Sequence, residues 1–140
     1  MNLVRRISGL LLVALVPAIF SGFLHPKRAA WIKPDADNGI ELAGTRQWGT
    51  DILWVDARPR TDFERAHIPG AVNLNEDEWE QLLDGFLDAW KRNFRVVVYC
   101  SSASCDASHE VAKRIKSETP ITDVYVLKGG WESWQAAQKR

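Results

Sequence analysis

At residues 96–106 the chain reads Val96-Val97-Val98-Tyr99-Cys100-Ser101-Ser102-Ala103-Ser104-Cys105-Asp106. The apolar run at its start predicts a short buried strand, and the polar residues after Cys100 predict a loop. A helical pattern follows at about residues 107–117, with Val111, Ala112 and Ile115 on its inner face. The stretch therefore predicts a strand that delivers a thiol to a loop at the N-terminus of a helix.

This position favours reactive sulfur at Cys100. Backbone N–H groups and the positive end of the helix dipole stabilise negative charge at a helix N-terminus. The thiolate is the form of cysteine that attacks electrophiles. We therefore expect Cys100 to be a nucleophile, and the order strand, loop, helix places it beyond the carboxyl end of a sheet, where ligands bind in open α/β folds.

Other apolar runs extend the predicted sheet. Residues 51–55 and 124–127 read as buried strands, and residues 71–74 are a weaker candidate. Helical patterns lie between them. Thr61 with Glu64 and Asn75 with Glu78 fit capping boxes at two helix starts. The second helix carries an apolar stripe that we interpret as core, formed by Trp79, Leu82, Leu83, Phe86, Leu87 and Trp90. Strands that alternate with helices predict an α/β fold with a mostly parallel sheet.

Charge is distributed unevenly along the chain. The net charge is zero, but residues 1–30 contain four basic residues and no acidic ones, and the remainder has 14 basic and 18 acidic residues. The acidic balance of residues 31–140 argues against a nucleic-acid surface.

The N-terminal segment predicts a membrane anchor or a signal peptide, here assigned to residues 1–30. Residues 7–24 are continuously apolar or small, follow Arg5-Arg6, and would span about 27 Å as a helix. We therefore expect membrane contact through residues 7–24 and a domain that is exported to the periplasmic or extracytoplasmic side. Residues 31–49 are interpreted as a linker that leads into the domain, which is assigned to residues 50–140.

Three blocks of sequence make residues 50–135 resemble the rhodanese-like domains. They are Val55-Asp56-Ala57-Arg58 with Phe63, Glu64 and His67 to Leu74; Val96 to Cys100; and Leu127 to Trp131 with Trp134. The resemblance implies a three-layer rhodanese-like α/β fold, with a mostly parallel central sheet and helices on both faces. It also implies a single-domain sulfurtransferase that needs no cofactor and no metal.

In such an enzyme Cys100 is the catalytic residue, and residues Ser101, Ser102, Ala103, Ser104, Cys105 and Asp106 form the active-site loop. Cys100 takes sulfur from a small donor such as thiosulfate, carries it as a persulfide, and passes it to a thiol or protein acceptor. Asp56 and Arg58 are interpreted as support for the loops at the carboxyl edge of the sheet. His67 is interpreted as part of a turn and not as a catalytic residue.

The loop departs from the family at Cys105 and Asp106, where a basic residue often attracts the anionic donor. Thiosulfate is therefore a doubtful donor. Cys105 is either a resolving thiol for Cys100 or a small residue that packs in the loop, and both interpretations stay open. Two alternatives to sulfur transfer remain: a thiol–disulfide redox protein that uses both cysteines, and a non-catalytic interaction domain. A phosphatase loop of the C-x5-R type would need arginine at position 106, where the chain has Asp106.

Overall fold

The computed structural model describes residues 38–102 and 105–139. The predicted anchor or signal peptide at residues 1–30, with its apolar stretch 7–24, lies outside these ranges. Among the helices within them, none has the length and apolarity needed to cross a bilayer.

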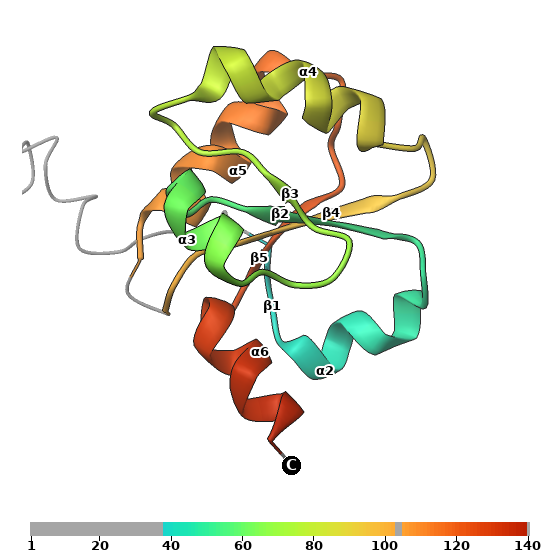
Figure 1. The fold of residues 1–140 in the computed structure, drawn as a ribbon. Coiled ribbons are helices and arrows are strands. Elements are labelled where there is room, and N and C mark those ends of the chain that lie inside the picture. Colours follow the sequence, from blue (N-terminus) through green and yellow to red (C-terminus); the bar gives the residue numbers. More distant parts are fainter. Residues whose placement is uncertain (1–37, 103–104, 140) are drawn as a thin grey trace, which may run out of the picture. The chain divides into compact units, whose positions relative to one another are not determined.

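The core of the molecule is a parallel sheet with the strand order β1-β5-β4-β2-β3 (Figure 1). Its strands are β1 (Gly39–Ile40), β2 (Ile52–Asp56), β3 (Val72–Asn73), β4 (Arg95–Tyr99) and β5 (Val124–Leu127). The predicted strands at residues 51–55, 71–74, 96–99 and 124–127 are confirmed. β1 comes from the range interpreted as the linker, and its pairing with β5 makes part of that range belong to the sheet.

Helices cover both faces of this sheet, which confirms the predicted three-layer α/β fold. They are α2 (Leu42–Thr45), the 3-10 turn η2 (Arg46–Trp48), α3 (Arg60–Arg65), α4 (Trp79–Ala89), α5 (Ala107–Glu118) and α6 (Gly130–Gln138). In Figure 1, α4 and α5 lie above the sheet, and α2 and α6 lie below it.

Strand β4 shows how the sequence builds the two hydrophobic layers. Successive side chains of a strand point to opposite faces. Val96 and Val98 join the cluster on the face of the sheet covered by α4 and α5, whereas Val97 and Tyr99 join the cluster on the face covered by α2 and α6. All four side chains are fully buried. The strand is apolar on both faces, as expected for the centre of a covered parallel sheet.

The start of α3 corrects one prediction. The helix begins at Arg60 after Pro59, and no side chain caps it. The carbonyl of Pro59 accepts hydrogen bonds from the N–H groups of Asp62 and Phe63. Thr61 therefore lies inside the helix, and the capping box with Glu64 is wrong. Pro59 is the N-cap residue, with an extended ψ of 149°, and its carbonyl accepts the first hydrogen bonds of the helix.

The second predicted capping pair is present, but it precedes α4. The N–H of Glu78 donates to Asn75 Oδ1 at 2.8 Å, and Asn75 Nδ2 donates to Glu78 Oε2 at 3.3 Å. The two hydrogen bonds close a turn before the helix begins at Trp79. Because of its bonds to Arg60 and Asn75, Glu78 has a pKa below its usual value.

The apolar stripe of α4 is confirmed as core with one exception. Trp79 and Phe86 are buried, and Leu82, Leu83 and Trp90 pack partly buried against the same cluster. Leu87, by contrast, is 37% exposed. At about 100° per residue, Leu87 lies some 80° around the helix from Trp79, farther than any other stripe residue on that side. The predicted inner face of α5 is confirmed, with Val111, Ala112 and Ile115 buried.

Candidate active site

Cys100 directly follows β4 and is 4% exposed. Its carbonyl accepts a hydrogen bond of 2.7 Å from the N–H of Trp131, and the carbonyl of Ser101 accepts one of 3.1 Å from Glu132. Both donors belong to the first turn of α6, whose N–H groups have no partner within the helix. The start of the loop is therefore held by a helix that lies 30 residues farther along the chain.

Gly130 permits this close approach. Its φ is +52°, and a Cβ placed on it would lie 2.3 Å from the carbonyl oxygen of Cys100. Glycine is the residue that adopts this conformation at low cost and leaves room for neighbouring backbone. Gly130 thus shapes the site around Cys100.

The other end of the loop joins α5. The N–H of Cys105 donates to the carbonyl of Ser102 at 3.3 Å, and Ser108 Oγ donates to the carbonyl of Cys105 at 3.4 Å. Asp106 is exposed, and its backbone carbonyl accepts from the N–H groups of His109 and Glu110 at the start of the helix. Ala103 and Ser104 lie outside the described residues.

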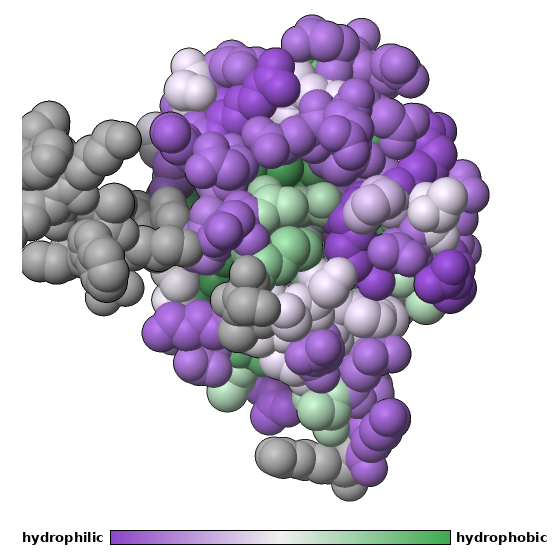
Figure 2. Space-filling model, turned by 90° about the vertical axis from the view of Figure 1, so that its left-hand side faces the viewer, coloured by the Kyte–Doolittle hydropathy of each residue, from purple (hydrophilic) through white to green (hydrophobic). Residues whose placement is uncertain are grey.

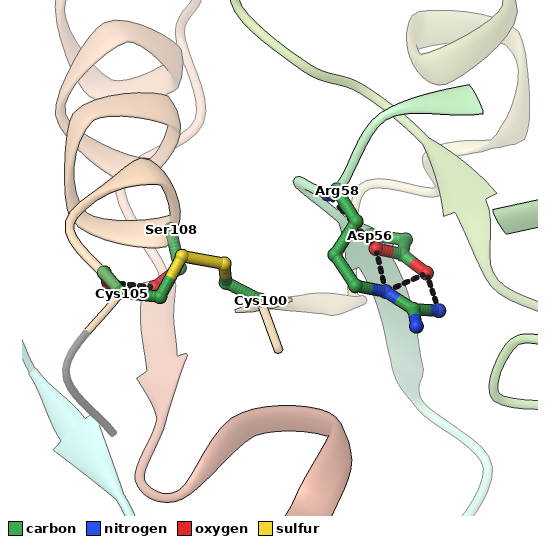
Figure 3. Close-up of a disulfide and its surroundings, with 5 residues drawn as sticks. All are labelled: Asp56, Arg58, Cys100, Cys105 and Ser108. Atoms are coloured by element: carbon green, nitrogen blue, oxygen red, sulfur yellow. Dashed lines mark hydrogen bonds and ion pairs between the residues drawn. A yellow bond between two sulfur atoms is a disulfide. The ribbon is translucent and has the colours of Figure 1, made fainter. Parts of the chain in front are cut away.

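Cys100 and Cys105 are joined by a disulfide (Figure 3). Their Cα atoms are 6.1 Å apart, within the usual range for a disulfide. In this state both sulfur atoms are oxidised, so neither is a free nucleophile. Of the two interpretations of Cys105 that the sequence left open, the structure therefore agrees with a thiol that reaches Cys100.

Asp56 and Arg58 form a buried ion pair at the carboxyl end of β2. Arg58 Nη2 lies 2.6 Å from Asp56 Oδ2, and Arg58 Nε lies 2.9 Å from Oδ1. Arg58 Nη2 also donates to the carbonyl of Ala66, and Asn73 Nδ2 donates to the carbonyls of both residues of the pair. The pair thus connects β2, β3 and the end of α3. In Figure 3 it forms a unit separate from the disulfide.

Burial lowers the pKa of Arg58, but the hydrogen bonds to Asp56 and the charge of Asp56 together raise it by more. The pKa of Arg58 is therefore above its ordinary value. The guanidinium also lies 4.8 Å from the ring centroid of Trp131 and 5.7 Å from that of Tyr99, in cation–π contact. The guanidinium therefore stays charged. Its two aromatic neighbours are Tyr99, which precedes Cys100 in β4, and Trp131 of α6, whose N–H donates to the Cys100 carbonyl.

Tyr99 was predicted only as part of the strand, yet its hydroxyl has a specific role. The oxygen accepts a hydrogen bond of 3.1 Å from the N–H of Ile68, which ties β4 to the turn after α3. Burial raises the pKa of Tyr99 well above its usual value. The sequence could have indicated this hydrogen bond, because Tyr99 carries the one hydroxyl in an otherwise apolar run and a buried hydroxyl requires a partner.

His67 lies in the turn after α3, beyond the C-cap residue Ala66. Its Nδ1 lies 2.8 Å from the carbonyl oxygen of Phe63, and the two rings stack with centroids 4.0 Å apart. These contacts agree with a structural role for the turn.

The surface around the loop combines apolar and polar residues. Figure 2 views the side of the molecule where α3 and the start of α5 lie, and hydrophobic residues there are enclosed by hydrophilic ones. A hollow of about 380 Å³ lies away from this loop. It is next to Phe94 and Asp123, which directly precede β4 and β5, and so lies at the N-terminal ends of these strands. Within residues 38–102 and 105–139, no three Cys, His, Asp or Glu side chains form a group that could hold a metal ion.

Known proteins are similar to this chain in sequence or in fold. The uncharacterized protein YibN of Escherichia coli K12 is 33% identical over 84 residues, which are 60% of this chain and 56% of YibN, so the chain spans little more than half of that relative. Thiosulfate sulfurtransferase GlpE of Shewanella oneidensis is 32% identical over 59% of this chain and 75% of its own length. The solution structure of the rhodanese-like domain of Anabaena Alr3790 has a TM-score of 0.55 at 23% identity, covering 72% of this chain and 75% of that domain's chain.

The family model of the rhodanese-like domain matches residues 41–137. This match covers every strand from β2 to β5, the loop with both cysteines, and α6 except its last residue, Gln138. The sequence, the parallel sheet and the position of Cys100 after its central strand therefore agree, and the chain belongs to the rhodanese-like domain family.

Proposed function

We propose that this protein is a sulfurtransferase that carries sulfane sulfur as a persulfide on Cys100. The observation that carries the proposal is the position of Cys100, at the end of β4 in the loop between the N-termini of α5 and α6. The GlpE relative, which is named a thiosulfate sulfurtransferase, supports the same reaction class.

The reaction begins with the reduced protein. The Cys100 thiolate attacks the outer sulfur of a persulfide donor, a bond from Cys100 Sγ to that sulfur forms, and the donor thiolate leaves. An acceptor thiolate then attacks the outer sulfur of the Cys100 persulfide and regenerates the Cys100 thiolate. Both steps pass through anionic sulfur, which the two nearby helix N-termini favour.

The charges of the site favour persulfide donors over thiosulfate. Asp106 brings an exposed carboxylate to the loop, while the guanidinium of Arg58 is occupied by Asp56. Thiosulfate is a compact dianion whose whole charge would enter the site, where it meets the Asp106 carboxylate while the guanidinium of Arg58 is already paired with Asp56. A low-molecular-weight or protein persulfide is the donor class that fits, and a thiol is the matching acceptor.

Reversible thiol–disulfide exchange is the second candidate function, because Cys100 and Cys105 are joined in the structure. A redox protein of this kind would pass its disulfide to a substrate dithiol and take up no sulfur.

One experiment separates the two candidates. The full chain is reduced under anaerobic conditions, mixed with glutathione persulfide or with thiosulfate, and measured by intact mass and by thiocyanate formation after addition of cyanide. With glutathione persulfide, sulfur transfer predicts a one-sulfur adduct or thiocyanate formation above the protein-free background. The signal should be smaller with thiosulfate, and Cys100→Ser should show no adduct and only the background. Thiocyanate formation that is unchanged in Cys100→Ser would refute the proposal, and a chain that takes no sulfur but oxidises dithiols would favour the redox function.

For the location, we propose that residues 7–24 hold the protein at a membrane with the domain on the extracytoplasmic side. The apolar composition of that segment after Arg5-Arg6 supports this. Cell fractionation, followed by labelling of reduced Cys100 with a membrane-impermeant maleimide in intact bacterial cells lacking an outer-membrane barrier, tests it. A chain found only in the aqueous fraction, or one unlabelled until cells are lysed, contradicts the corresponding half of the proposal.

A further inference from the structure

Cys105 is bonded to Cys100 through sulfur, and its position determines which sulfur of a Cys100 persulfide it can attack. The backbone of Cys105 is tied to Ser102 on one side and, through Ser108, to the first turn of α5 on the other. From this position its Sγ atom is bonded to Sγ of Cys100. The sulfur of Cys100 that Cys105 reaches is the one attached to Cβ, which in a Cys100 persulfide is the inner sulfur.

We infer that Cys105 discharges the Cys100 persulfide and releases its outer sulfur as hydrosulfide. The inference rests on the proposed function, since it requires a loaded Cys100. The Cys105 thiolate attacks the inner sulfur, the Sγ–Sγ bond seen in the structure forms, and the bond between inner and outer sulfur breaks. The outer sulfur leaves with the bonding electron pair and the persulfide proton, as HS⁻.

Electrons balance within this step. The sulfane sulfur gains two electrons and becomes sulfide, and the two cysteines lose two electrons and become the disulfide. A further turnover requires a dithiol reductant, which returns both cysteines to thiols and is itself oxidised to a disulfide. Sulfide, rather than a persulfidated acceptor, is then the product whenever such a dithiol is supplied.

The geometry also favours this internal step over transfer to an outside thiol. Cys105 is part of the same loop, so its attack is unimolecular, whereas an outside acceptor must first diffuse to the site. Cys105 lies two residues before α5, a helix of 12 residues, so the helix N-terminus favours its thiolate as well.

The test uses the full chain, reduced and kept anaerobic, with glutathione persulfide as donor. The Cys105→Ser variant retains the nucleophile and lacks the discharging thiol, so we expect it to hold a stable one-sulfur adduct on Cys100. Wild type is expected to release about one hydrosulfide per chain above the Cys100→Ser background, as the stoichiometry of the exchange requires. Its mass should then show no adduct and the loss of two hydrogens. Dithiothreitol should convert this single release into continued turnover.

The outcomes distinguish the inference from the proposed function. If neither wild type nor Cys105→Ser takes up sulfur and no sulfide above background appears, the proposed sulfurtransferase function fails. If both hold the adduct equally long and release no sulfide, Cys100 is loaded but Cys105 does not discharge it, and the inference is overturned. An adduct that moves to Cys105, located by peptide mass, overturns it as well, because Cys105 then attacks the outer sulfur.

Discussion

Replacing Gly130 with alanine probes how α6 holds the active-site loop. Two costs follow from the structure. First, Gly130 has a φ of +52°, and a side chain in this region costs about 1–2 kcal/mol. Second, the new Cβ would lie 2.3 Å from the Cys100 carbonyl oxygen, so the two backbones must separate by at least 0.7 Å to reach 3.0 Å. That movement disrupts the 2.7 Å bond from the N–H of Trp131.

The second cost can be isolated with Gly70→Ala. Gly70 has a φ of +80°, but a Cβ there meets no atom within 4 Å. It therefore carries the conformational cost alone, about 1–2 kcal/mol. At Gly130 the buried Cys100 carbonyl also loses its partner, which adds about 1–3 kcal/mol. We expect Gly130→Ala to destabilise the protein by about 2–5 kcal/mol in total.

Urea unfolding of both variants, with the Cys100–Cys105 disulfide confirmed by mass, measures the difference. With a slope of about 2 kcal/mol per molar urea, the midpoint of Gly130→Ala should lie about 0.5–1.5 M below that of Gly70→Ala. Equal midpoints would refute the reasoning, because they would mean that the contact between α6 and Cys100 contributes nothing to stability.

Four further substitutions test the ion pair, the core and the buried Tyr99 hydroxyl. Asp56→Asn leaves the guanidinium of Arg58 buried without a counter-charge, so urea unfolding should show a loss of about 3–5 kcal/mol; a loss below 1 kcal/mol contradicts the buried pair. Phe86→Ala should cost about 3–5 kcal/mol and Leu87→Ala less than about 1 kcal/mol, because Phe86 is 1% and Leu87 37% exposed; similar losses would contradict the exposed position of Leu87. Burial raises the pKa of Tyr99, so the stability that the un-ionised phenol contributes is complete below about pH 10 and is lost at higher pH. Between pH 9 and 11 the urea midpoint of Tyr99→Phe should therefore fall less steeply than that of wild type. Parallel curves would argue against burial of an un-ionised phenol.

The disulfide joins the two cysteines of the loop between β4 and α5. In the oxidised state the proposed nucleophile is blocked, and a two-electron reduction restores it. The proposed sulfur transfer would therefore require a dithiol reductant each time the disulfide forms, whether by discharge of a persulfide or by exchange with another protein.

The local pattern of the sequence was sufficient for the fold class and for the position of Cys100 directly after the central strand. Val96 to Tyr99 is apolar at every position, and only a central strand covered on both faces requires that, so the parallel sheet and the position of Cys100 follow from residues close together in the chain. The same local reasoning failed at Thr61, because the backbone of Pro59 starts that helix without a side-chain cap, and at Leu87, because the width of a buried helix face depends on what packs against it.

The contacts between distant residues were decided only by tertiary structure. The strand β1, formed by Gly39–Ile40, exists because it pairs with β5, which lies more than 80 residues away. Likewise, the bond from Trp131 to Cys100 and the ring of Trp131 beneath the Arg58 guanidinium depend on where α6 meets β4. The sequence revealed that a second thiol stood in the loop, but its reach to Cys100 is set by the backbone path from β4 to α5, which no residue spacing specifies.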